Sequence, residues 1–563
     1  MCALRAINGF PATERAAVTG HPIESLERGA ISGTPLPDSP AASRVVTHLC
    51  VREILVALVP RFLSPRGLLV LYIVYTTFAK LSYNAKLRKL GARAPIRGAW
   101  LPLQLDLAYS IIKAALDDRM YEFWEHTFRN YSRNGCYTIE SGIGERVIMT
   151  ADPENIKAIL ATQFKDYGKG EQFHKDFEDF LGDGIFNADG QIWHNSRQLI
   201  RPQFIKDRLS DIDIFEEHVQ KLMVKLGEGE VDMMDMFFRF TLDAATHFLL
   251  GSDIGSLEHP QTAFADAFGR VQHIQSLIAR IGQVQSPLNK FIPRRRMGFY
   301  TSLKIMDDFV NNYIEKALAL SPDELEEKGK HDSGYTFLHA IAGYTRDRKV
   351  LRDQLVSILL AGRDTTACTL TWAIYEMSRQ PHIIAKLRQE IIQQVGLERQ
   401  PTYQDLKDMK YLSHIINETL RLYPVVPYNV RVALHDTTLP VGGGPDGTQP
   451  IAILKNTPIG YSTLVMQRRH DLYPPPETGF PAVDEFCPER WNNWTPKSWT
   501  YVPFNGGPRI CIGQQFALTE MGYTLVRLFQ RFETVENRMG GQLAGMHSDI
   551  VLQPSNVVKV MFR

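Results

Sequence analysis

One cysteine near the end of the chain lies among residues that give the backbone unusual freedom. Cys511 belongs to the segment FNGGPRICIG, residues 504–513, here named the cysteine loop. Backbone N–H groups of Gly-rich turns can approach a sulfur and stabilise its negative charge where bulkier residues would block the way. The following residues, QQFALTEMGYTLVRLFQRFE, have helical spacing, so the thiol would precede a positive helix terminus. The pattern indicates a thiolate that binds a metal or attacks a substrate, although no histidine base for a nucleophile lies nearby.

The cysteine loop resembles the haem-ligand signature of the cytochrome P-450 superfamily. The matching pattern is Phe504-x-x-Gly507-x-Arg509-x-Cys511-x-Gly513. The resemblance implies that Cys511 is the axial ligand of the iron of haem b, where its thiolate favours O–O cleavage. It also implies that Arg509 meets a haem propionate and that the other matched residues belong to the cofactor-binding loop. An inert buried cysteine, the usual role of a lone thiol, fits less well once further motifs of the family are considered.

A second motif resembles the oxygen-activation segment of the same family. It reads AGRDTT, residues 361–366. The resemblance implies that Ala361 and Gly362 let a helix pass close over the haem face, and that Asp364 and Thr365 form an acid–alcohol pair that relays protons to dioxygen. Taken alone, the segment would indicate a helix kinked by glycine, with threonines bonded back to the preceding turn.

Two further groups of residues follow the family's order. Trp193 and Arg197 lie four residues apart in GQIWHNSRQLIRPQF, on one helical face, and are similar to the pair that binds a haem propionate. Arg431, in VPYNVRVA, occupies a position that often joins them. The resemblance therefore implies that three arginines, with Arg509, and one indole N–H balance two carboxylates. On its own, W-x-x-x-R would indicate core packing.

The third group is structural rather than catalytic. Glu418 and Arg421 lie three residues apart on one helical face, and Arg490 follows in DEFCPERW. The resemblance implies a buried charge network behind the haem, whereas an isolated E-x-x-R would be a surface pair. Cys487 stands where relatives often carry a basic residue. The segment YPPPETGFPAVD is longer and richer in proline than expected, so its conformation is not predicted from the sequence.

The elements that must position these residues are mostly helical. A long buried helix is predicted for LRDQLVSILLAGRDTTACTLTWAIYEMSRQP, ending before Pro381. Strands are predicted in CYTIESGIGERVIMTAD and between about 425 and 465. GIGERV and VGGGPDG are interpreted as hairpin turns rather than dinucleotide-binding loops. The fold class is therefore mainly α with small β-sheets, and residues 98–563 are expected to form a single haem-thiolate monooxygenase domain.

The first hundred residues have a different character. Residues 1–44 lack periodicity and are interpreted as a disordered segment. Residues 45–97 contain apolar runs at 54–59 and 67–79 and a basic flank at 80–97, which predict a membrane anchor with the following domain in the cytosol. We expect the membrane to be that of the endoplasmic reticulum. A buried core helix or a helix lying in the membrane interface are the alternatives.

Composition excludes some classes of function. The 63 basic and 62 acidic residues give a formal net charge of +1, so no electrostatic footprint for nucleic acid is present. The six cysteines are scattered, without the spacing of a zinc site or the density of a disulfide scaffold.

The expected reaction is monooxygenation of a hydrophobic substrate by O2. Asp364 and Thr365 are both present, whereas isomerase and dehydratase relatives can dispense with such a pair. Residues 512–563 are too few for a flavin or nicotinamide domain. The resemblance therefore implies that electrons come from NADPH through a separate, membrane-bound NADPH-cytochrome P-450 reductase.

Three segments are most similar to those of fungal microsomal alkane and fatty-acid hydroxylases. They are LRLYPVVPYNVRVALHDTTLPVGGGPDG, LGDGIFNADGQIW and FNGGPRICIGQQFALTE. Hydroxylation of a long aliphatic chain at or near its end is therefore expected. The alternatives are a tailoring hydroxylase of a polyketide or terpenoid and, more remotely, a non-catalytic haem-binding sensor. The residues expected to face the substrate are Phe173, Phe177, Leu360, Ala361, Val426 and Tyr428.

Overall fold

The computed structural model describes residues 64–98, 101, 105–141, 146–204, 212–259, 262–282, 294, 297–331 and 335–563. The chain divides into two compact units between Leu81 and Ser82, and the second, the main unit, runs to Arg563. The segment 1–44, expected to be disordered, and the apolar run 54–59 lie outside the described residues.

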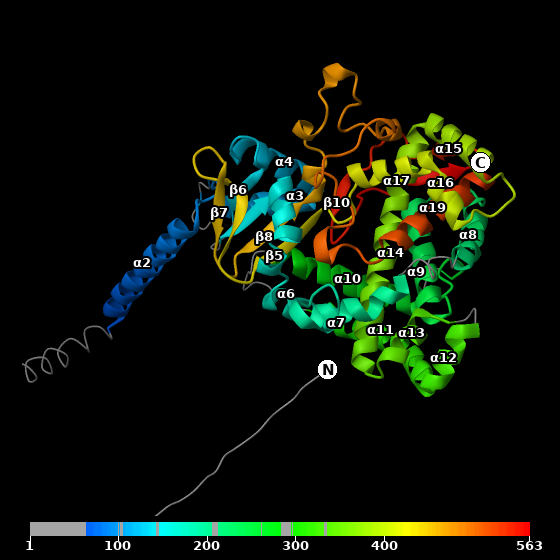
Figure 1. Ribbon diagram of the computed structural model, residues 1–563, viewed down its shortest axis with the longest axis horizontal. Helices are drawn as coiled ribbons and strands as arrows, with labels where there is room; N and C mark the ends of the chain where they lie inside the picture. The colour runs from blue at the N-terminus through cyan, green and yellow to red at the C-terminus, as the bar shows by residue number, and fades with distance from the viewer. Residues whose placement is uncertain are drawn as a thin grey trace, which may run out of the picture. The chain divides into compact units, whose positions relative to one another are not determined.

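Helices make up most of the main unit, as predicted (Figure 1). After α2 (Pro65–Leu90), which includes the boundary between the units, they are α3 (Leu105–Leu116), α4 (Met120–Tyr131), α5 (Pro153–Lys157), α6 (Glu171–Leu181), α7 (Gly190–Ile200), α8 (Ile212–Leu226), α9 (Met233–Leu250), α10 (Ala263–Gly282), α11 (Phe299–Ala319), α12 (Pro322–His331), α13 (Phe337–Tyr344), α14 (Arg348–Arg379), α15 (Pro381–Gln394), α16 (Tyr403–Asp408), α17 (Lys410–Leu422), α18 (Thr463–Met466) and α19 (Gln514–Arg531).

The strands form small sheets, most of them at one side of the main unit (Figure 1). The largest sheet has the order β1-β2-β8-β5-β3, with β2 and β8 parallel and the other pairs antiparallel. Its strands are β1 (Thr138–Ser141), β2 (Val147–Thr150), β3 (Tyr167–Gly168), β5 (Tyr428–Ala433) and β8 (Pro458–Ser462). The smaller sheets contain β4 (Glu230–Asp232), β6 (Thr437–Gly443), β7 (Gln449–Ile453), β9 (Val535–Asn537), β10 (Met546–Ser548), β11 (Leu552–Pro554) and β12 (Lys559–Phe562).

Both predicted hairpins are present. β1 pairs with β2 and β6 pairs with β7, each antiparallel, so the glycine-containing segments between them join adjacent strands. Neither segment leads from a strand into a helix, which a dinucleotide-binding loop would require.

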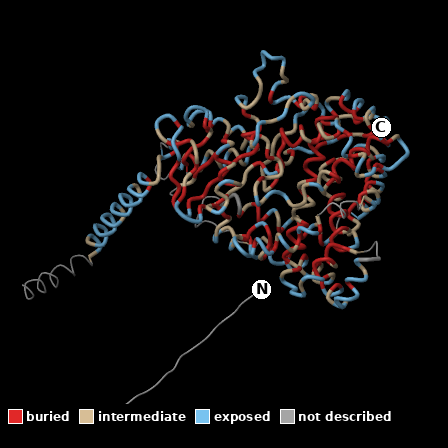
Figure 2. Tube along the Cα trace, viewed as in Figure 1, coloured by how far each residue is buried: buried red, intermediate tan, exposed pale blue. Residues whose placement is uncertain are grey.

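The long predicted helix is α14, which passes through the buried interior of the main unit (Figures 1 and 2). The side chain of Asp347 caps its first turn by accepting hydrogen bonds from the N–H groups of Lys349 and Val350. The helix ends at Arg379, two residues before Pro381. It packs along α9, and most of its side chains are buried. Residues 360–363 and Thr365 are the exception, because they keep accessible surface in the middle of this buried helix.

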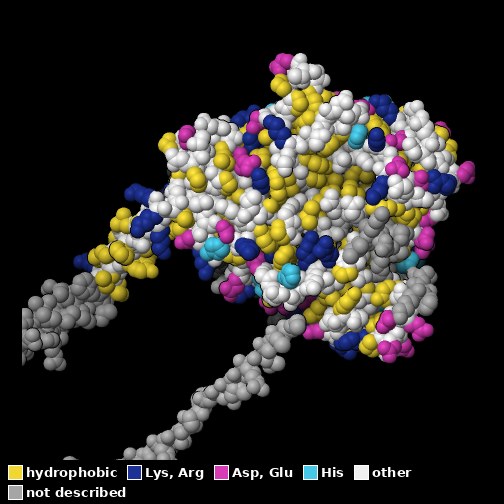
Figure 3. Space-filling view, viewed as in Figure 1, with side chains coloured by type: hydrophobic (Ala, Val, Ile, Leu, Met, Phe, Trp, Pro, Cys, Tyr) yellow, Lys and Arg dark blue, Asp and Glu magenta, His cyan; other side chains and the backbone are white. Residues whose placement is uncertain are grey.

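The helix α2 is exposed over most of its length. Its large apolar side chains between Leu68 and Leu81 are exposed, including Tyr75 and Phe78 at 71%, and they gather on its surface in Figure 3. Within the described ranges, no helix combines the length and apolar character needed to cross a membrane. The membrane span predicted over 67–79 is therefore not supported. The apolar run of α2 is followed by Lys80, Lys86, Arg88 and Lys89, which leaves it shorter than the ~20 residues of a bilayer span.

Candidate active site

The cysteine loop folds back on itself just before α19. The backbone N–H of Cys511 donates to the carbonyl oxygen of Phe504 at 2.9 Å, and α19 begins at Gln514. Burial raises the pKa of the Cys511 thiol, whereas the N–H of Gly513 and the nearby Arg197 lower it. These two groups favour the thiolate, but burial outweighs them, so the pKa of the thiol lies above its usual value.

A glycine is required at one point of this loop. Gly507 has a φ of +63°, and a Cβ atom built on it would lie 1.9 Å from the carbonyl oxygen of Leu160. Leu160 belongs to a turn of π-helix, Ala158–Thr162, that packs against the loop. Glycine therefore allows both the left-handed backbone and the close approach of this turn.

The Cys511 side chain combines accessible surface with a crowded surrounding. The Cys511 side chain is exposed, although enough protein surrounds its sulfur for burial to raise the pKa of the thiol. A side chain that is surrounded by protein on most sides and accessible on one side would show both the accessible surface and the raised pKa. A sulfur in that setting can bind a ligand on its accessible side.

Three buried cations lie close to the cysteine loop. Arg509 donates from Nη2 to the carbonyl oxygen of Ala188 at 2.8 Å and to Oδ1 of Asp189 at 2.6 Å. Arg431 and Lys169 both donate to Oδ1 of Asn429, at 3.2 and 3.0 Å.

The electrostatics of this group indicate an excess of positive charge. The pKa of Lys169 lies well below its usual value because of burial and of repulsion by Arg431 and Arg509. Burial and Arg431 also lower the pKa of Arg509 to about 10. Among the described residues, Asp189 is the one carboxylate whose charge opposes those of Lys169 and Arg509. An anion placed beside these cations would be stabilised.

The predicted propionate pair, Trp193 and Arg197, lies on α7 and approaches the same loop. The Arg509 guanidinium lies 4.7 Å from the centroid of the Trp193 ring. Arg197 donates from Nη1 to the carbonyl oxygen of Ile510 at 3.0 Å, next to Cys511. The structure therefore brings Trp193, Arg197 and Arg509 together around one segment of the chain.

The acid and the alcohol of α14 have different partners. Oδ2 of Asp364 accepts a short hydrogen bond from the side-chain amide of Gln272 on α10, and Oδ1 lies 3.4 Å from Nη1 of Arg363. Burial raises the pKa of Asp364 to about 6, although Arg363 opposes the shift. Thr365 donates from Oγ1 to the carbonyl oxygen of Ala361 at 2.8 Å, which is the back-bonded geometry considered from the sequence.

Ala361 and Gly362 are the two small residues of the motif AGRDTT on α14. Ala361 keeps accessible surface, as do Leu360 and Thr365. A Cβ atom on Gly362 would point toward Ala245 of α9, at 3.8 Å. That distance is an ordinary van der Waals contact, so the packing of α14 on α9 does not itself require glycine, and Gly362 keeps accessible surface as Ala361 does.

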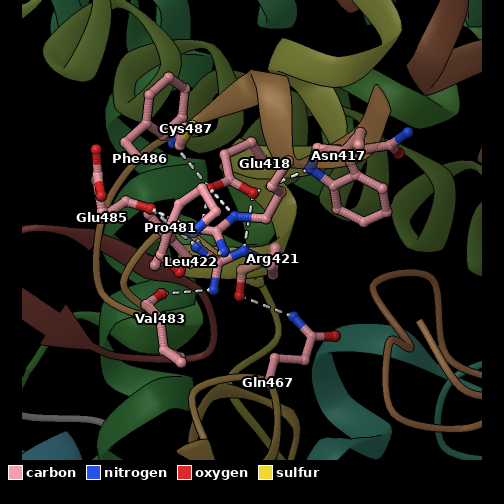
Figure 4. A network of polar contacts seen from close by, with 12 residues as sticks. Asn417, Glu418, Arg421, Leu422, Gln467, Pro481, Val483, Glu485, Phe486 and Cys487 are labelled. Atoms are coloured by element: carbon pink, nitrogen blue, oxygen red, sulfur yellow. Dashed lines mark hydrogen bonds and ion pairs between the residues drawn. The ribbon is translucent and has the colours of Figure 1, made fainter. Parts of the chain in front are cut away.

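The predicted charge network is assembled and fully buried (Figure 4). Glu418 accepts hydrogen bonds from both arginines, with 2.8 Å to Nε of Arg421 and 2.8 Å to Nε of Arg490. Burial alone would raise the pKa of Glu418, but the arginines lower it below its usual value. The network is completed by the backbone N–H of Cys487 at 2.9 Å and the indole N–H of Trp491 at 3.0 Å.

The same arginines hold the proline-rich loop YPPPETGFPAVD, whose conformation was not predicted from the sequence. Arg421 donates to the carbonyl oxygen of Val483 at 2.7 Å, and Arg490 donates to that of Ala482 at 2.8 Å. Both also donate to the carbonyl oxygen of Glu485. Cys487 takes part through its backbone, so a basic side chain is not needed at this position.

The six residues expected to face the substrate differ in how far they are buried. Five of them have accessible surface, namely Leu360, Ala361, Val426, Phe173 and Tyr428. The hydroxyl of Tyr428 donates to the carbonyl oxygen of Met120 at 3.2 Å. Phe173 and Phe177 stack at 4.4 Å, and Phe177 is buried in the core.

Sequence reasoning missed several groups at this site. Lys169 and Gln272 come from segments without a recognised motif, and Asp189 lies in the quoted segment LGDGIFNADGQIW but was not singled out. Glu520 on α19 is buried, its pKa is raised to about 8 by burial, and its carboxyl group is hydrogen-bonded to the side chain of Thr366 on α14. Glu520 was the one of these residues that the sequence could have marked. It lies inside the helix predicted after the cysteine loop, and a carboxylate is rarely buried without a partner.

Comparison with known proteins identifies the family. The chain matches the family Cytochrome P450 over residues 102–561. It is 48% identical over 518 residues to cytochrome P450 monooxygenase pvhE of Talaromyces variabilis, which covers 88% of this chain and 94% of the relative. It is 40% identical over 452 residues to cytochrome P450 52A13 of Debaryomyces hansenii, with 77% and 84% covered. The solved haem domain of cytochrome P450DA has the same fold, with a TM-score of 0.66 and 20% identity over 84% of this chain and 96% of that one. The chain therefore belongs to the cytochrome P450 family and is a monooxygenase.

Proposed function

We propose that this cytochrome P450 hydroxylates a long-chain fatty acid or alkane at or near its end. The reaction consumes the substrate R–H, O2, two electrons and two protons, and gives R–OH and water. The observation that carries the choice of substrate is the apolar accessible surface of Leu360 and Ala361 in the middle of a buried helix, with Val426 38% exposed. Apolar walls suit a lipid tail, and the resemblance to fungal alkane and fatty-acid hydroxylases supports the same class.

A tailoring hydroxylase acting on a polyketide or terpenoid is the second candidate. The monooxygenase from Talaromyces variabilis is 48% identical to this chain, compared with 40% for cytochrome P450 52A13. This chain is therefore less similar to the 52A protein than to the Talaromyces variabilis enzyme, so sequence identity does not favour an alkane or fatty acid over a polyketide or terpenoid.

The family implies a haem cofactor, and the residues present fit one. The accessible thiol of Cys511 offers the axial ligand, and the buried cations offer partners for two propionates. We assign propionate binding to Trp193, Arg197, Arg431 and Arg509, and add Lys169, whose lowered pKa would be restored by an anion. Phe504, Gly507 and Gly513 shape the loop, and Ala361 and Gly362 leave room above it. Bound there, haem b supplies the activation of dioxygen and the transfer of one oxygen atom.

Electrons are proposed to come from NADPH through a separate NADPH-cytochrome P-450 reductase. The reductase is expected to dock on the side of the domain that carries Cys511.

Two side chains of α14 are assigned to proton delivery. Asp364, with its pKa raised to about 6, can hold or release a proton near neutral pH, and the amide of Gln272 orients its carboxyl group. Thr365 has accessible surface on the turn that carries Ala361, so its hydroxyl can pass a proton toward the reacting oxygen.

The Thr365→Ala variant is expected to keep its haem and to lose most of its coupling. Positioned proton transfer contributes about 10²–10⁴-fold to a rate, so electrons taken from NADPH should leave mainly as hydrogen peroxide. The measurement is the ratio of hydroxylated product and of peroxide to NADPH consumed. Thr365→Ser should restore coupling, and Thr371→Ala, which removes another back-bonded hydroxyl of α14, should leave it unchanged. Normal coupling in Thr365→Ala would contradict the assigned role.

The substrate class is tested by difference spectra of the haem-loaded protein with fatty acids, alkanes, polyketides and terpenoids. Binding of long aliphatic chains, followed by NADPH-dependent hydroxylation with added reductase, is the expected result. Turnover confined to a polyketide or terpenoid would select the second candidate.

We further propose that α2 attaches the enzyme to the endoplasmic reticulum membrane, with the main unit in the cytosol. Its apolar side chains are exposed, and four of its basic residues, Lys80, Lys86, Arg88 and Lys89, lie in its C-terminal part, with Arg66 in the first turn. This combination favours a helix at the surface of an anionic leaflet.

Removal of residues 1–81 is expected to release the enzyme into the soluble fraction. The cut leaves Leu87, which packs against Ala452 and Leu454 of the main unit. A milder variant replaces Leu71, Tyr75 and Phe78 by serine, and it should weaken binding to vesicles that contain anionic lipid. Unchanged sedimentation of the truncated protein with membranes would contradict the assignment.

A further inference from the structure

A group of histidines and carboxylates joins α8 to the end of α9, on elements that do not carry Cys511. Glu217 and His218 belong to α8, and His247 lies in the last turn of α9. Nε2 of His218 lies 3.1 Å from Nδ1 of His247, and Oε2 of Glu217 lies 3.7 Å from the same Nδ1. One ligand atom from each residue lies within 4.8 Å of the others.

These distances suit three ligands of one small cation. Bonds of about 2.0–2.2 Å to imidazole nitrogen and carboxylate oxygen, arranged tetrahedrally, place neighbouring ligand atoms about 3.4 Å apart. The separations of 3.1 and 3.7 Å lie on either side of that value. The two imidazole rings are nearly perpendicular, at 87°, and without an ion Nε2 of His218 and Nδ1 of His247 are within hydrogen-bond distance of each other.

The buried histidine has the surroundings of a metal ligand. The His218 side chain has no exposed surface, and its Nδ1 has no hydrogen-bond partner but faces Oδ2 of Asp253 at 3.7 Å. A histidine that binds a metal through one nitrogen usually presents the other to a carboxylate, which fixes the tautomer.

The charges around Glu217 leave its Oε2 atom available as a ligand. Lys221 donates from Nζ to Oε1 of Glu217 at 3.0 Å and to Oδ2 of Asp253 at 2.7 Å, so Oε2 of Glu217 remains directed to His247. Asp243 lies nearby but is already committed, because its carboxyl group accepts hydrogen bonds from Ser256 and Leu257.

We propose that Glu217, His218 and His247 bind a divalent transition-metal ion, with Zn²⁺ as the preferred ion and Asp253 orienting His218. Two imidazoles and one carboxylate form a ligand set that suits zinc. Three protein ligands leave the fourth tetrahedral position to water. The ion would join α8 to the C-terminal turn of α9.

The test is zinc binding by the untagged, haem-loaded full chain. After dialysis against Zn²⁺, elemental analysis should find one more zinc per haem in the wild type than in His247→Ala. His247 is 27% exposed, so its replacement should leave the fold intact, which the haem content and the carbon monoxide spectrum would check. The matched control is His382→Ala, an exposed histidine on α15, which should bind as much zinc as the wild type.

Two further variants separate a metal site from a simple charge network. Asp253→Asn should weaken zinc binding by about 10–100-fold, the usual effect of losing a carboxylate behind a ligating histidine. Lys221→Met removes a positive charge from the cluster and should keep or increase zinc affinity. Zinc X-ray absorption should show nitrogen and oxygen ligands. Equal zinc content in His247→Ala and the wild type, or a sulfur ligand, would overturn the proposal.

Discussion

Cys511→Ala is expected to abolish the reduced carbon monoxide spectrum of a thiolate-bound haem and to reduce hydroxylation to background. Cys511 carries the exposed thiol of the cysteine loop, at the point where Arg197 and the N–H of Gly513 stabilise negative charge. Alanine removes the sulfur and leaves the backbone hydrogen bond to Phe504 in place, because that bond comes from the main chain. The measurement is the absolute and difference spectrum of purified protein, together with product formation in the presence of a reductase.

Two variants make this result interpretable. Cys487→Ala removes another partly exposed thiol, whose backbone N–H continues to bind Glu418, and it should keep the full spectrum. Cys511→His offers a nitrogen in place of sulfur, so haem can be retained while the thiolate spectrum is lost. A thiolate spectrum that survives in Cys511→Ala would show that the iron is bound elsewhere.

The parts of the site that the sequence predicts are those in which neighbouring residues act together. The cysteine loop, the turn at Ala361 and the Glu418–Arg421 pair each lie within a few residues, so their spacing alone indicates a shared face or loop. Arg490 joins Glu418 from 72 residues away, and only the resemblance to the family connects them. Helical periodicity also predicted α14, because apolar residues recur along it at spacings of three and four.

The parts that could not be predicted depend on contacts between distant segments. Lys169 reaches Arg431 through Asn429, 260 residues further along the chain, and nothing in the local sequence marks it as buried. Gln272 contacts Asp364 across 92 residues in the same way. The need for glycine at 507 follows from the carbonyl group of Leu160 and not from the loop itself. Hydropathy over 67–79 indicated a membrane span, but the charged residues that continue α2 shorten its apolar part.

Arg490→Ala is expected to destabilise the domain by about 3–5 kcal/mol, the usual cost of removing one partner from a buried ion pair. Arg490 is fully buried, and its Nε donates to Oε1 of Glu418 at 2.8 Å. Its Nη2 also donates to the carbonyl oxygens of Ala482 and Glu485, at 2.8 and 2.9 Å. Alanine therefore leaves part of the Glu418 charge and the carbonyl oxygen of Ala482 without their partner, whereas the carbonyl oxygen of Glu485 keeps its hydrogen bond from Arg421.

The comparison that isolates this effect uses an exposed pair beside the same loop. Lys386 contacts Glu489 with half of its side chain exposed, so Lys386→Ala should cost about 0–1 kcal/mol. Urea unfolding midpoints and the fraction of purified protein that carries thiolate-bound haem give the two readouts. Arg490→Lys should recover only part of the loss, because an ammonium group cannot reproduce the forked contacts of the guanidinium. If Arg490→Ala were no less stable than Lys386→Ala, Arg490 would not be holding the proline-rich loop, and the carbonyl oxygen of Ala482 would need another donor.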